Sequence, residues 1–302
     1  MPSTREIRRR ITSAKNISQI TRAMEMVAAS RMKRAQAAVL AGRPYAEKIE
    51  DVIQHLSARI QASGDEGSHP LLESRPVKQI AVIMVTADKG LAGALNTNVI
   101  RRTTRFILEQ GDVPVNMIAV GRKGRDFMVR YGRPLIAEFT NLGDRPTIVD
   151  VRPIARVATD EYISGRADVV YLVYTDFVNT LVQRPTVYQL LPADITHVGE
   201  EGSMPGENRP RETSTPVDYE YEPGTREVLS QLVPRYVEVR VYQALLEHLA
   251  SEHSARMVAM RNATQSAKDM ISDLTLAYNK LRQANITREI IEVSSGATAL
   301  TG

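Results

Sequence analysis

RYVEVRVYQALLEHLASEHSARMVAMRNATQSAKDMISDLTLAYNKLRQANITREIIEVSS, residues 235–295, is the longest regular pattern in the chain. It contains neither glycine nor proline, so no residue in it would end a helix. Two series of residues spaced by seven run through it, as in a coiled-coil seam. The first series is Val239, Leu246, His253, Met260, Ala267, Leu274 and Leu281, and the second is Tyr242, Leu249, Arg256, Ala263, Met270, Ala277, Ala284 and Ile291. The stretch predicts a helix of about 90 Å, at about 1.5 Å per residue.

A helix of this length needs an apolar partner, because helical stability in water comes mostly from burying one face. A compact chain of 302 residues is only about 50 Å across, so we expect the helix to extend beyond a compact body. The N-terminal segment offers the partner, because Ser3 to Ala41 has no glycine or proline and repeats apolar or small residues at steps of three and four. Gly42 and Pro44 then predict an interruption, after which the helical pattern resumes from 45 to 60.

The middle of the chain has a different pattern. Apolar runs typical of strands occupy 79–86, 113–120 and 168–175, and helical patterns follow at 96–110, 123–131 and 148–164. This alternation predicts a small, largely parallel α/β sheet. We expect an N-terminal shaft helix at 1–61, a linker at 62–76, a central α/β domain at 77–197, a loop at 198–224 and a C-terminal shaft helix at 225–302. The two shaft helices would form an antiparallel coiled coil, with the central domain inserted between them.

Composition narrows the class of protein. The chain has no cysteine, which excludes disulfides, thiolate catalysis and cysteine-based zinc sites. No apolar run approaches the roughly 18 residues of a membrane span, so we expect a soluble or peripheral protein. The formal net charge is +4, and residues 1–50 hold eleven basic side chains against four acidic ones. The basic residues that we expect on the shaft are Arg8, Arg9, Arg10, Arg31, Lys33 and Arg34.

No motif predicts an active site. The loop DKGLAGA, residues 88–94, lies between a predicted strand and a predicted helix, where a helix N-terminus could bind phosphate. It lacks the spacing of a dinucleotide-binding motif and the Lys-Ser/Thr ending of a P-loop, so we interpret it as a tight turn. The five histidines lack metal-ligand spacing. We predict no catalytic residue, no metal and no cofactor.

Other functions remain open at this level. The N-terminal arginines could neutralise phosphates in a basic coiled-coil protein that binds nucleic acid. No aromatic residue is interleaved before Tyr45, which favours a solvated helix face or an acidic protein partner. An α/β enzyme with a helical appendage would need a ligand in the 88–94 loop. His253 and Arg256 form a polar break in the heptad core, which either fixes the register or is enclosed by another element.

Several motifs closely resemble those of one family. They are AMEMVAASRMKRAQ (23–36), RPYAEKI (43–49), TADKGLAGALN (86–96), SEHSARMVAMRNAT (251–264), YNKLRQANITREI (278–290) and the ending SSGATAL. By these motifs the chain is identified as a member of the γ-subunit family of bacterial F-type ATP synthases, with similarity from Arg5 to Leu300. The plastid form of this family carries two regulatory cysteines, and the absence of cysteine excludes that form.

The resemblance implies a fold, a function and partners. The terminal helices would form a shaft inside a hexamer of three α and three β subunits, and the middle would be a Rossmann-like domain that meets the ε subunit and the c-ring. One copy per complex would rotate with the ring and couple proton flow to ATP synthesis or hydrolysis on β. The subunit itself would be non-catalytic, without cofactor or nucleic acid, and peripheral on the cytoplasmic side of the inner cell membrane.

The resemblance also implies interface residues. Met24 and Arg256 would lie where the shaft passes an acidic lever segment of β, and the basic N-terminal segment would supply complementary charge. Gln283, Thr287 and the neighbouring Arg282 match positions that hydrogen-bond inner loops of α and β. Arg288 occupies a position where many family members have glutamine.

Overall fold

The computed structural model describes residues 3–62, 69–193, 221–222 and 224–301. It divides into two compact units. Unit 1 comprises Met1–Ala28 and Met257–Gly302, and unit 2 comprises Ala29–Arg256. Two long helices contribute to both units: α1 spans Thr4–Ala62 and α5 spans Thr225–Thr301. Most of the loop that we expected at 198–224 lies outside the described residues.

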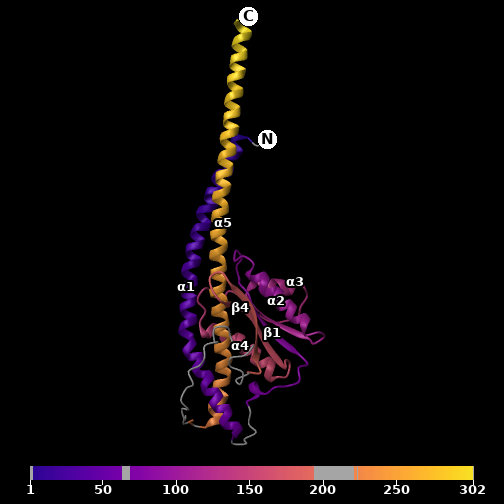
Figure 1. Cartoon of the computed structure of the whole chain (residues 1–302). Helices are drawn as coiled ribbons and strands as arrows, with labels where there is room; N and C mark the ends of the chain where they lie inside the picture. The colour runs from indigo at the N-terminus through magenta and orange to yellow at the C-terminus, as the bar shows by residue number, and fades with distance from the viewer. Residues whose placement is uncertain (1–2, 63–68, 194–220, 223, 302) are drawn as a thin grey trace. The chain divides into compact units, whose positions relative to one another are not determined.

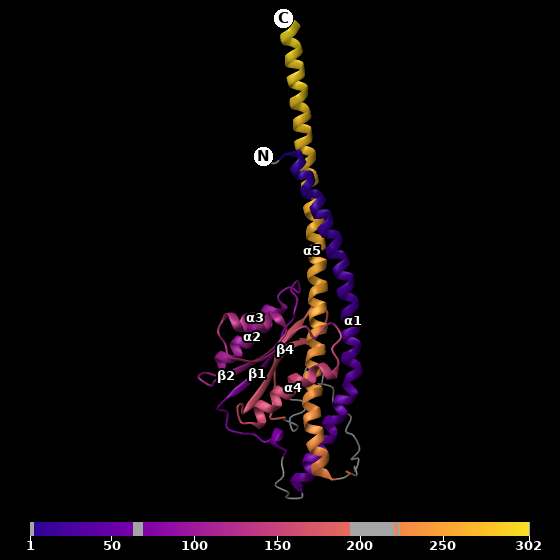
Figure 2. The same cartoon turned by 180° about the vertical axis from the view of Figure 1, so that it is seen from behind.

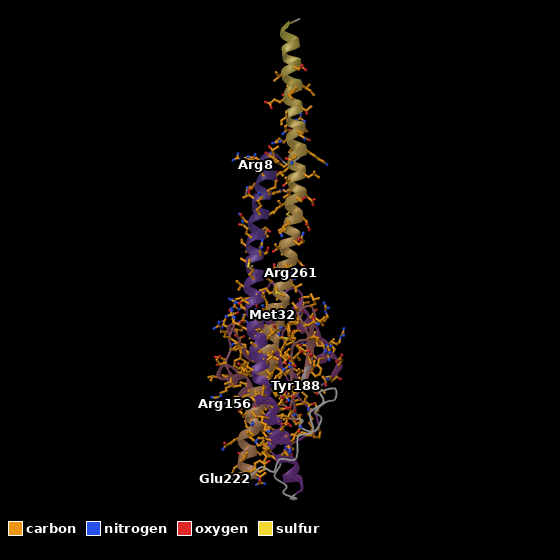
Figure 3. The ribbon with its side chains drawn as sticks, turned by 60° about the vertical axis from the view of Figure 1, so that its left-hand side comes forward. Arg8, Met32, Arg156, Tyr188, Glu222 and Arg261 are labelled. Carbon is orange, nitrogen blue, oxygen red and sulfur yellow. The ribbon has the colours of Figure 1, made fainter. Side chains whose placement is uncertain are left out.

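In unit 1 the two helices form the predicted antiparallel coiled coil. Successive contacts from α1 reach progressively lower numbers on α5: Arg8 to Tyr278, Thr21 to Thr264, and Glu25 to Arg261. The residues of α1 that are buried here are spaced by seven, as a seam requires: Ile7, Ala14, Thr21 and Ala28. Figure 3 shows Arg8 on α1 beside α5.

Only one of the two heptad series of α5 stays in the seam. Members of the first series are buried from Val239 through Ala267, whereas Met270 and Ile291 of the second series are 57% and 58% exposed. Every described side chain from 282 to 295 is exposed, because α1 begins at Thr4 and its Arg8 already pairs with Tyr278.

The predicted interruption at Gly42 and Pro44 is wrong, because α1 is a single helix with Pro44 inside it. A proline in a helix interior removes one backbone hydrogen bond. Burial nevertheless continues across the proline with heptad spacing, at Met32, Val39, Ala46 and Ile53. This burial favours one helical course on both sides of Pro44 and offsets the lost bond.

Unit 2 contains a five-stranded sheet with the order β3-β2-β1-β4-β5. The strands are β1 (Ile80–Val85), β2 (Val115–Val120), β3 (Leu135–Phe139), β4 (Val169–Phe177) and β5 (Gln183–Leu191). The first four are parallel and β5 is antiparallel to β4. The helices between them are α2 (Leu95–Glu109), α3 (Arg122–Arg130) and α4 (Ile148–Ile163), and a short 3-10 turn, η1, spans Pro70–Leu72. The largely parallel α/β domain is therefore confirmed, and β3 and β5 are strands that the sequence patterns did not predict.

The sheet is covered on both faces (Figures 1 and 2). Alternate residues of β1 belong to two separate clusters: Ala81, Ile83 and Val85 to one, and Ile80, Val82 and Met84 to the other. The second cluster includes Val99 and Phe106 of α2 and Met128 of α3. Burial on both faces explains why β1 is a continuous apolar run.

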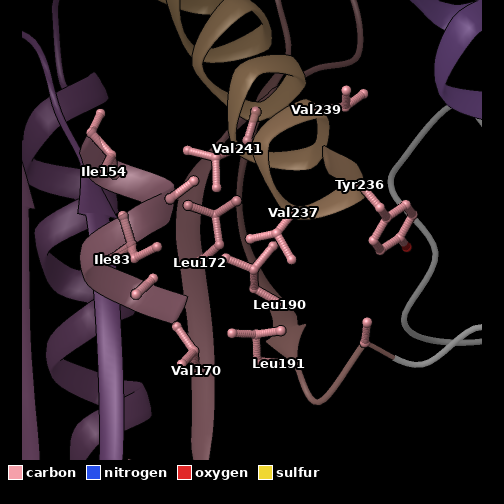
Figure 4. Packing of buried hydrophobic residues seen from close by; sticks show 14 of the residues in the cluster. Ile83, Ile154, Val170, Leu172, Leu190, Leu191, Tyr236, Val237, Val239 and Val241 are labelled. Carbon is pink, nitrogen blue, oxygen red and sulfur yellow. The ribbon is translucent and has the colours of Figure 1, made fainter. Parts of the chain in front are cut away.

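The larger cluster joins α1, α4 and α5 to the sheet. It includes Ile49 and Ile53 of α1, Ile154 of α4, Leu172 and Leu190 of the sheet, and Val237 and Val241 of α5. Figure 4 shows Val237 of α5 close to Leu190 of β5. Leu71 of η1 belongs to the same cluster, so the predicted linker at 62–76 contributes a core residue.

Candidate functional site

The carboxyl ends of β1, β2 and β3 form the place where a parallel sheet usually binds a ligand. In unit 2 the N-terminus of α3 at this place is capped by the chain itself. The Asp88 carboxylate accepts hydrogen bonds from the backbone N–H of Arg122 (2.9 Å) and of Asn141 (2.9 Å). The next two N–H groups of α3 are also used, Lys123 to the Ala87 carbonyl and Gly124 to the Thr86 hydroxyl. Asp88 therefore caps the N-terminus of α3.

Two glycines at this end of the sheet serve close packing. Gly121 has a φ of 90°, and a Cβ there would lie 1.9 Å from the carbonyl oxygen of Thr86. A Cβ at Gly124 would lie 2.8 Å from the Thr86 hydroxyl oxygen. The GRKG sequence, residues 121–124, thus lets α3 approach the end of β1.

A cavity of about 220 Å³ lies between these loops and α5. Drug-sized ligands usually occupy about 300–1,000 Å³, so this cavity is small. His248 on its wall is 1% exposed, and neither ring nitrogen has a hydrogen-bond partner among the described residues. Burial, and to a lesser extent the neighbouring His253, lower the pKa of His248 to about 3, so its imidazole is neutral. The described residues include no group of three or more side chains suited to a metal ion.

The polar break at His253 and Arg256 is enclosed by elements of unit 2. Arg256 donates to the Glu252 carboxylate and, over 3.2 Å, to the Gly90 carbonyl oxygen. Its side chain is 12% exposed. His253 is buried, and its pKa falls to about 4, mainly through desolvation and next through the charge of Arg256. Of the two alternatives for this break, enclosure by another element is the one observed.

Other polar contacts tie the long helices to the same end of the sheet. Ser251 and Ser254 of α5 donate to the carbonyl oxygens of Thr175 (3.3 Å) and Thr180 (2.8 Å). On α1, Arg31 forms an ion pair of 2.6 Å with Asp144. These contacts attach both helices to the loops of the domain inserted between them.

The predicted interface residues differ in exposure. Met24 is half-buried in unit 1. Arg282, Gln283 and Thr287 are exposed on the part of α5 that α1 does not cover. Arg256 lies in unit 2, in the contacts described above.

The basic residues of α1 also lie in different surroundings. Arg8 donates to the Tyr278 hydroxyl (2.7 Å), Arg10 pairs with Glu6, and Arg31 pairs with Asp144. Arg31 is half-buried, whereas the other five are exposed: Arg8, Arg9, Arg10, Lys33 and Arg34. Side chains one residue apart on a helix point about 100° away from each other, so the three consecutive arginines spread around α1.

One surface was not singled out from the sequence. Beyond Leu281, α5 exposes large apolar side chains: Ile286, Ile290, Ile291 and Val293. In the coil of unit 1, α1 exposes Ile17, Ile20, Met26 and Val27. The heptad pattern counted Ile291 as a seam residue, and only the end of α1 reveals that it has no partner there. Exposed apolar residues in such number are typical of a protein interface.

No helix within the described ranges has the length and apolar character needed to span a membrane.

Comparisons with known proteins agree on one family. A family model described as ATP synthase matches residues 3–300. The ATP synthase gamma chain of Roseiflexus castenholzii is 56% identical over 99% of both chains, and that of Chloroflexus aurantiacus is 51% identical over the full length of both. Among solved structures, a chain of the central stalk and c-ring of the Tetrahymena thermophila mitochondrial ATP synthase is 25% identical with a TM-score of 0.61. The match covers 81% of this chain and 99% of that one. The chain therefore belongs to the ATP synthase gamma chain family.

Proposed function

We propose that the chain is the central-stalk rotor of a proton-translocating F-type ATP synthase. As a gamma chain it is a non-catalytic subunit, and the catalytic sites belong to the β subunits. One copy would turn inside the α3β3 hexamer and couple proton flow through the c-ring to ATP synthesis or hydrolysis, and it would also contact ε. The complex is membrane-associated, and we place this subunit on the cytoplasmic face of the inner cell membrane.

The observation that supports this function most directly is the uncovered end of α5. A single helix in water is marginally stable, and this one exposes large apolar residues along 286–293. A surrounding ring of subunits would bury them. An asymmetric two-helix coil offers a different set of contacts to each of three β subunits, and each set can bias the conformation of its site by a different free energy.

We propose that Arg282, Gln283 and Thr287 contact the inner loops of α and β, and that Met24 and Arg256 lie at the level of an acidic β segment. Exposed basic residues of α1, among them Arg9, Lys33 and Arg34, would add electrostatic complementarity. Arg256 would act there mainly through its loop contacts, since most of its side chain is covered.

The relatives give no support to a nucleic-acid-binding function. They also give no support to an α/β enzyme with a helical appendage.

Reconstitution tests the proposal. The chain is mixed with purified α and β subunits, and the product is examined for an ATP-hydrolysing hexamer that contains one copy of it. Gln283→Ala and Thr287→Ala should lower turnover in that hexamer without changing the stability of the isolated chain, since both side chains are exposed. Thr97→Ala, at an exposed position of α2, is the matched control. Failure to form a single-copy complex would refute the rotor assignment, and equal effects on turnover and stability would refute the interface.

A further inference from the structure

A buried ion pair joins the two long helices inside unit 2. Nη2 of Arg240 on α5 lies 2.9 Å from Oε1 of Glu50 on α1, and both residues are 2% exposed. The Arg240 guanidinium carbon lies 5.0 Å from the ring centre of Tyr236 and 5.9 Å from that of Tyr188. Tyr188 belongs to β5, and its hydroxyl lies 3.4 Å from that of Tyr236. Three elements, α1, α5 and the edge strand, therefore meet at one guanidinium.

Apolar packing alone could hold these elements together. The pair is set in the larger apolar cluster, which includes Ile49 and Ile53 of α1 and Val237 of α5. Removing two charges from water costs free energy that their attraction often fails to recover, so an apolar pair of similar size is commonly as stable or more stable. A buried ion pair does more for specificity, because a helix slipped by one turn would carry an unpaired charge into the core.

The pair lies at the same distance in sequence from a proline in each helix. Pro44 in α1 precedes Glu50 by six residues, and Pro234 in α5 precedes Arg240 by six. Each proline removes one hydrogen bond of its helix, which locally lowers the resistance of the backbone to bending and twisting.

A second link crosses between the helices beside the prolines. Nε of Arg235 donates to the Tyr45 hydroxyl over 3.3 Å, and its guanidinium carbon lies 5.9 Å from the Tyr45 ring centre. Each of these residues directly follows a proline. A side-chain contact between the two helices thus lies next to the proline in each helix, where one backbone hydrogen bond is missing.

We propose that Arg240 and Glu50 are positioning residues whose ion pair holds α1, α5 and β5 in a single register. In the rotor this ion pair transmits torque from the sheet to both helices without a change in the helix register. The consequence for torsion rests on the proposed function, whereas the register itself is a property of the isolated chain.

Spin labels test the register in the isolated full chain. The chain has no cysteine, so Glu47→Cys on α1 and Gln231→Cys on α5, both exposed, label it cleanly. We expect one narrow label-to-label distance in the parent protein. Arg240→Met alone or Glu50→Leu alone should lower the folding equilibrium constant about a hundredfold or more, because each leaves a buried charge. The double variant should recover the stability but give a broadened distance, or a second one shifted by about 5 Å, one helical turn.

The surface pair Arg261–Glu25 supplies a matched control. It joins the same two helices with the same residue types, but its arginine side chain is 64% exposed. Arg261→Met with Glu25→Leu should leave the distance between the two labels narrow. A label-to-label distance in the buried-pair double variant that is as narrow as in the parent would refute the role of the ion pair in the register. Single variants as stable as the parent would also refute it.

An experiment with the complete synthase distinguishes the role of the ion pair from the rotor assignment. The ratio of proton pumping to ATP hydrolysis should fall in the buried-pair double variant and stay unchanged in the surface-pair variant. A broadened label-to-label distance in the isolated chain, with an unchanged ratio of proton pumping to ATP hydrolysis, would support the role of the ion pair in the register. It would refute a role in transmitting torque. Failure of the unmodified chain to assemble would instead count against the rotor assignment.

Discussion

Replacing His248 by glutamine should remove a large part of the acid sensitivity of the isolated chain. In the native state burial lowers the pKa of His248 to about 3, while in the unfolded chain it has the ordinary value of 6.5. Between these two values the unfolded state binds a proton that the native state does not, so stability falls as the pH falls below 6.5. At pH 5.0 the gap of about 1.5 pH units corresponds to about 2 kcal/mol of unfolding free energy, at about 1.36 kcal/mol per unit.

Urea unfolding followed by circular dichroism measures this effect at pH 7.5 and at pH 5.0. The unmodified chain should lose about 2 kcal/mol more between these conditions than His248→Gln does. At pH 7.5 His248 is neutral in both states, so any difference there reports packing and serves as the internal control. His253, whose pKa is lowered to about 4, titrates in both proteins and largely cancels. Equal losses in the two proteins would refute a neutral, buried His248.

Three further predictions follow from packing and backbone geometry. Gly121→Ala should lower the unfolding free energy by more than about 3 kcal/mol, because its Cβ would lie 1.9 Å from a backbone oxygen. Gly143→Ala, at a φ of 79° with open space around it, should lower it by only about 1 kcal/mol. Thermal unfolding measures both. Leu246→Ala in the buried seam should cost about 2–5 kcal/mol and the half-buried Leu274→Ala less, and the reverse order in denaturant melts would contradict the assigned seam. Pro44→Ala should raise the unfolding free energy by about 1–3 kcal/mol by restoring a helix hydrogen bond, and a lower melting temperature would show that the proline is needed.

The parts of the fold that could be predicted are those in which one repeating pattern extends over many residues. The heptads of α5 bury one side of the helix from Val239 to Ala267, and the apolar runs of β1, β2 and β4 are buried along most of their length. Such burial imposes its period on the sequence, so the element can be recognised without knowing its partner.

The elements that were missed have weaker patterns. β3 is an edge strand with no fully buried residue, and β5 is an edge strand that carries Pro185. Edge strands tolerate proline and partial exposure because one side of each makes no ladder bonds, so their sequences look like loops. Pro44 led to a predicted interruption that α1 does not have, because burial of the residues around it outweighs the low helix propensity of proline.

Arg256 marks the limit of what a sequence pattern says about a site. The heptad count places it in the core, and the spacing of four from Glu252 already suggests a local ion pair. Neither pattern identifies the Gly90 carbonyl, which lies 166 residues away and reaches Arg256 only because the sheet brings the loop after β1 against α5. A cation in a heptad core position therefore indicates that a polar partner is needed. The sequence pattern does not identify that partner, because the inserted domain supplies it. Since both Arg256 and Arg240 are paired within the chain, the charges left for a surrounding ring are those that the coil leaves exposed, and the uncovered end of α5 offers such a ring apolar side chains to bury.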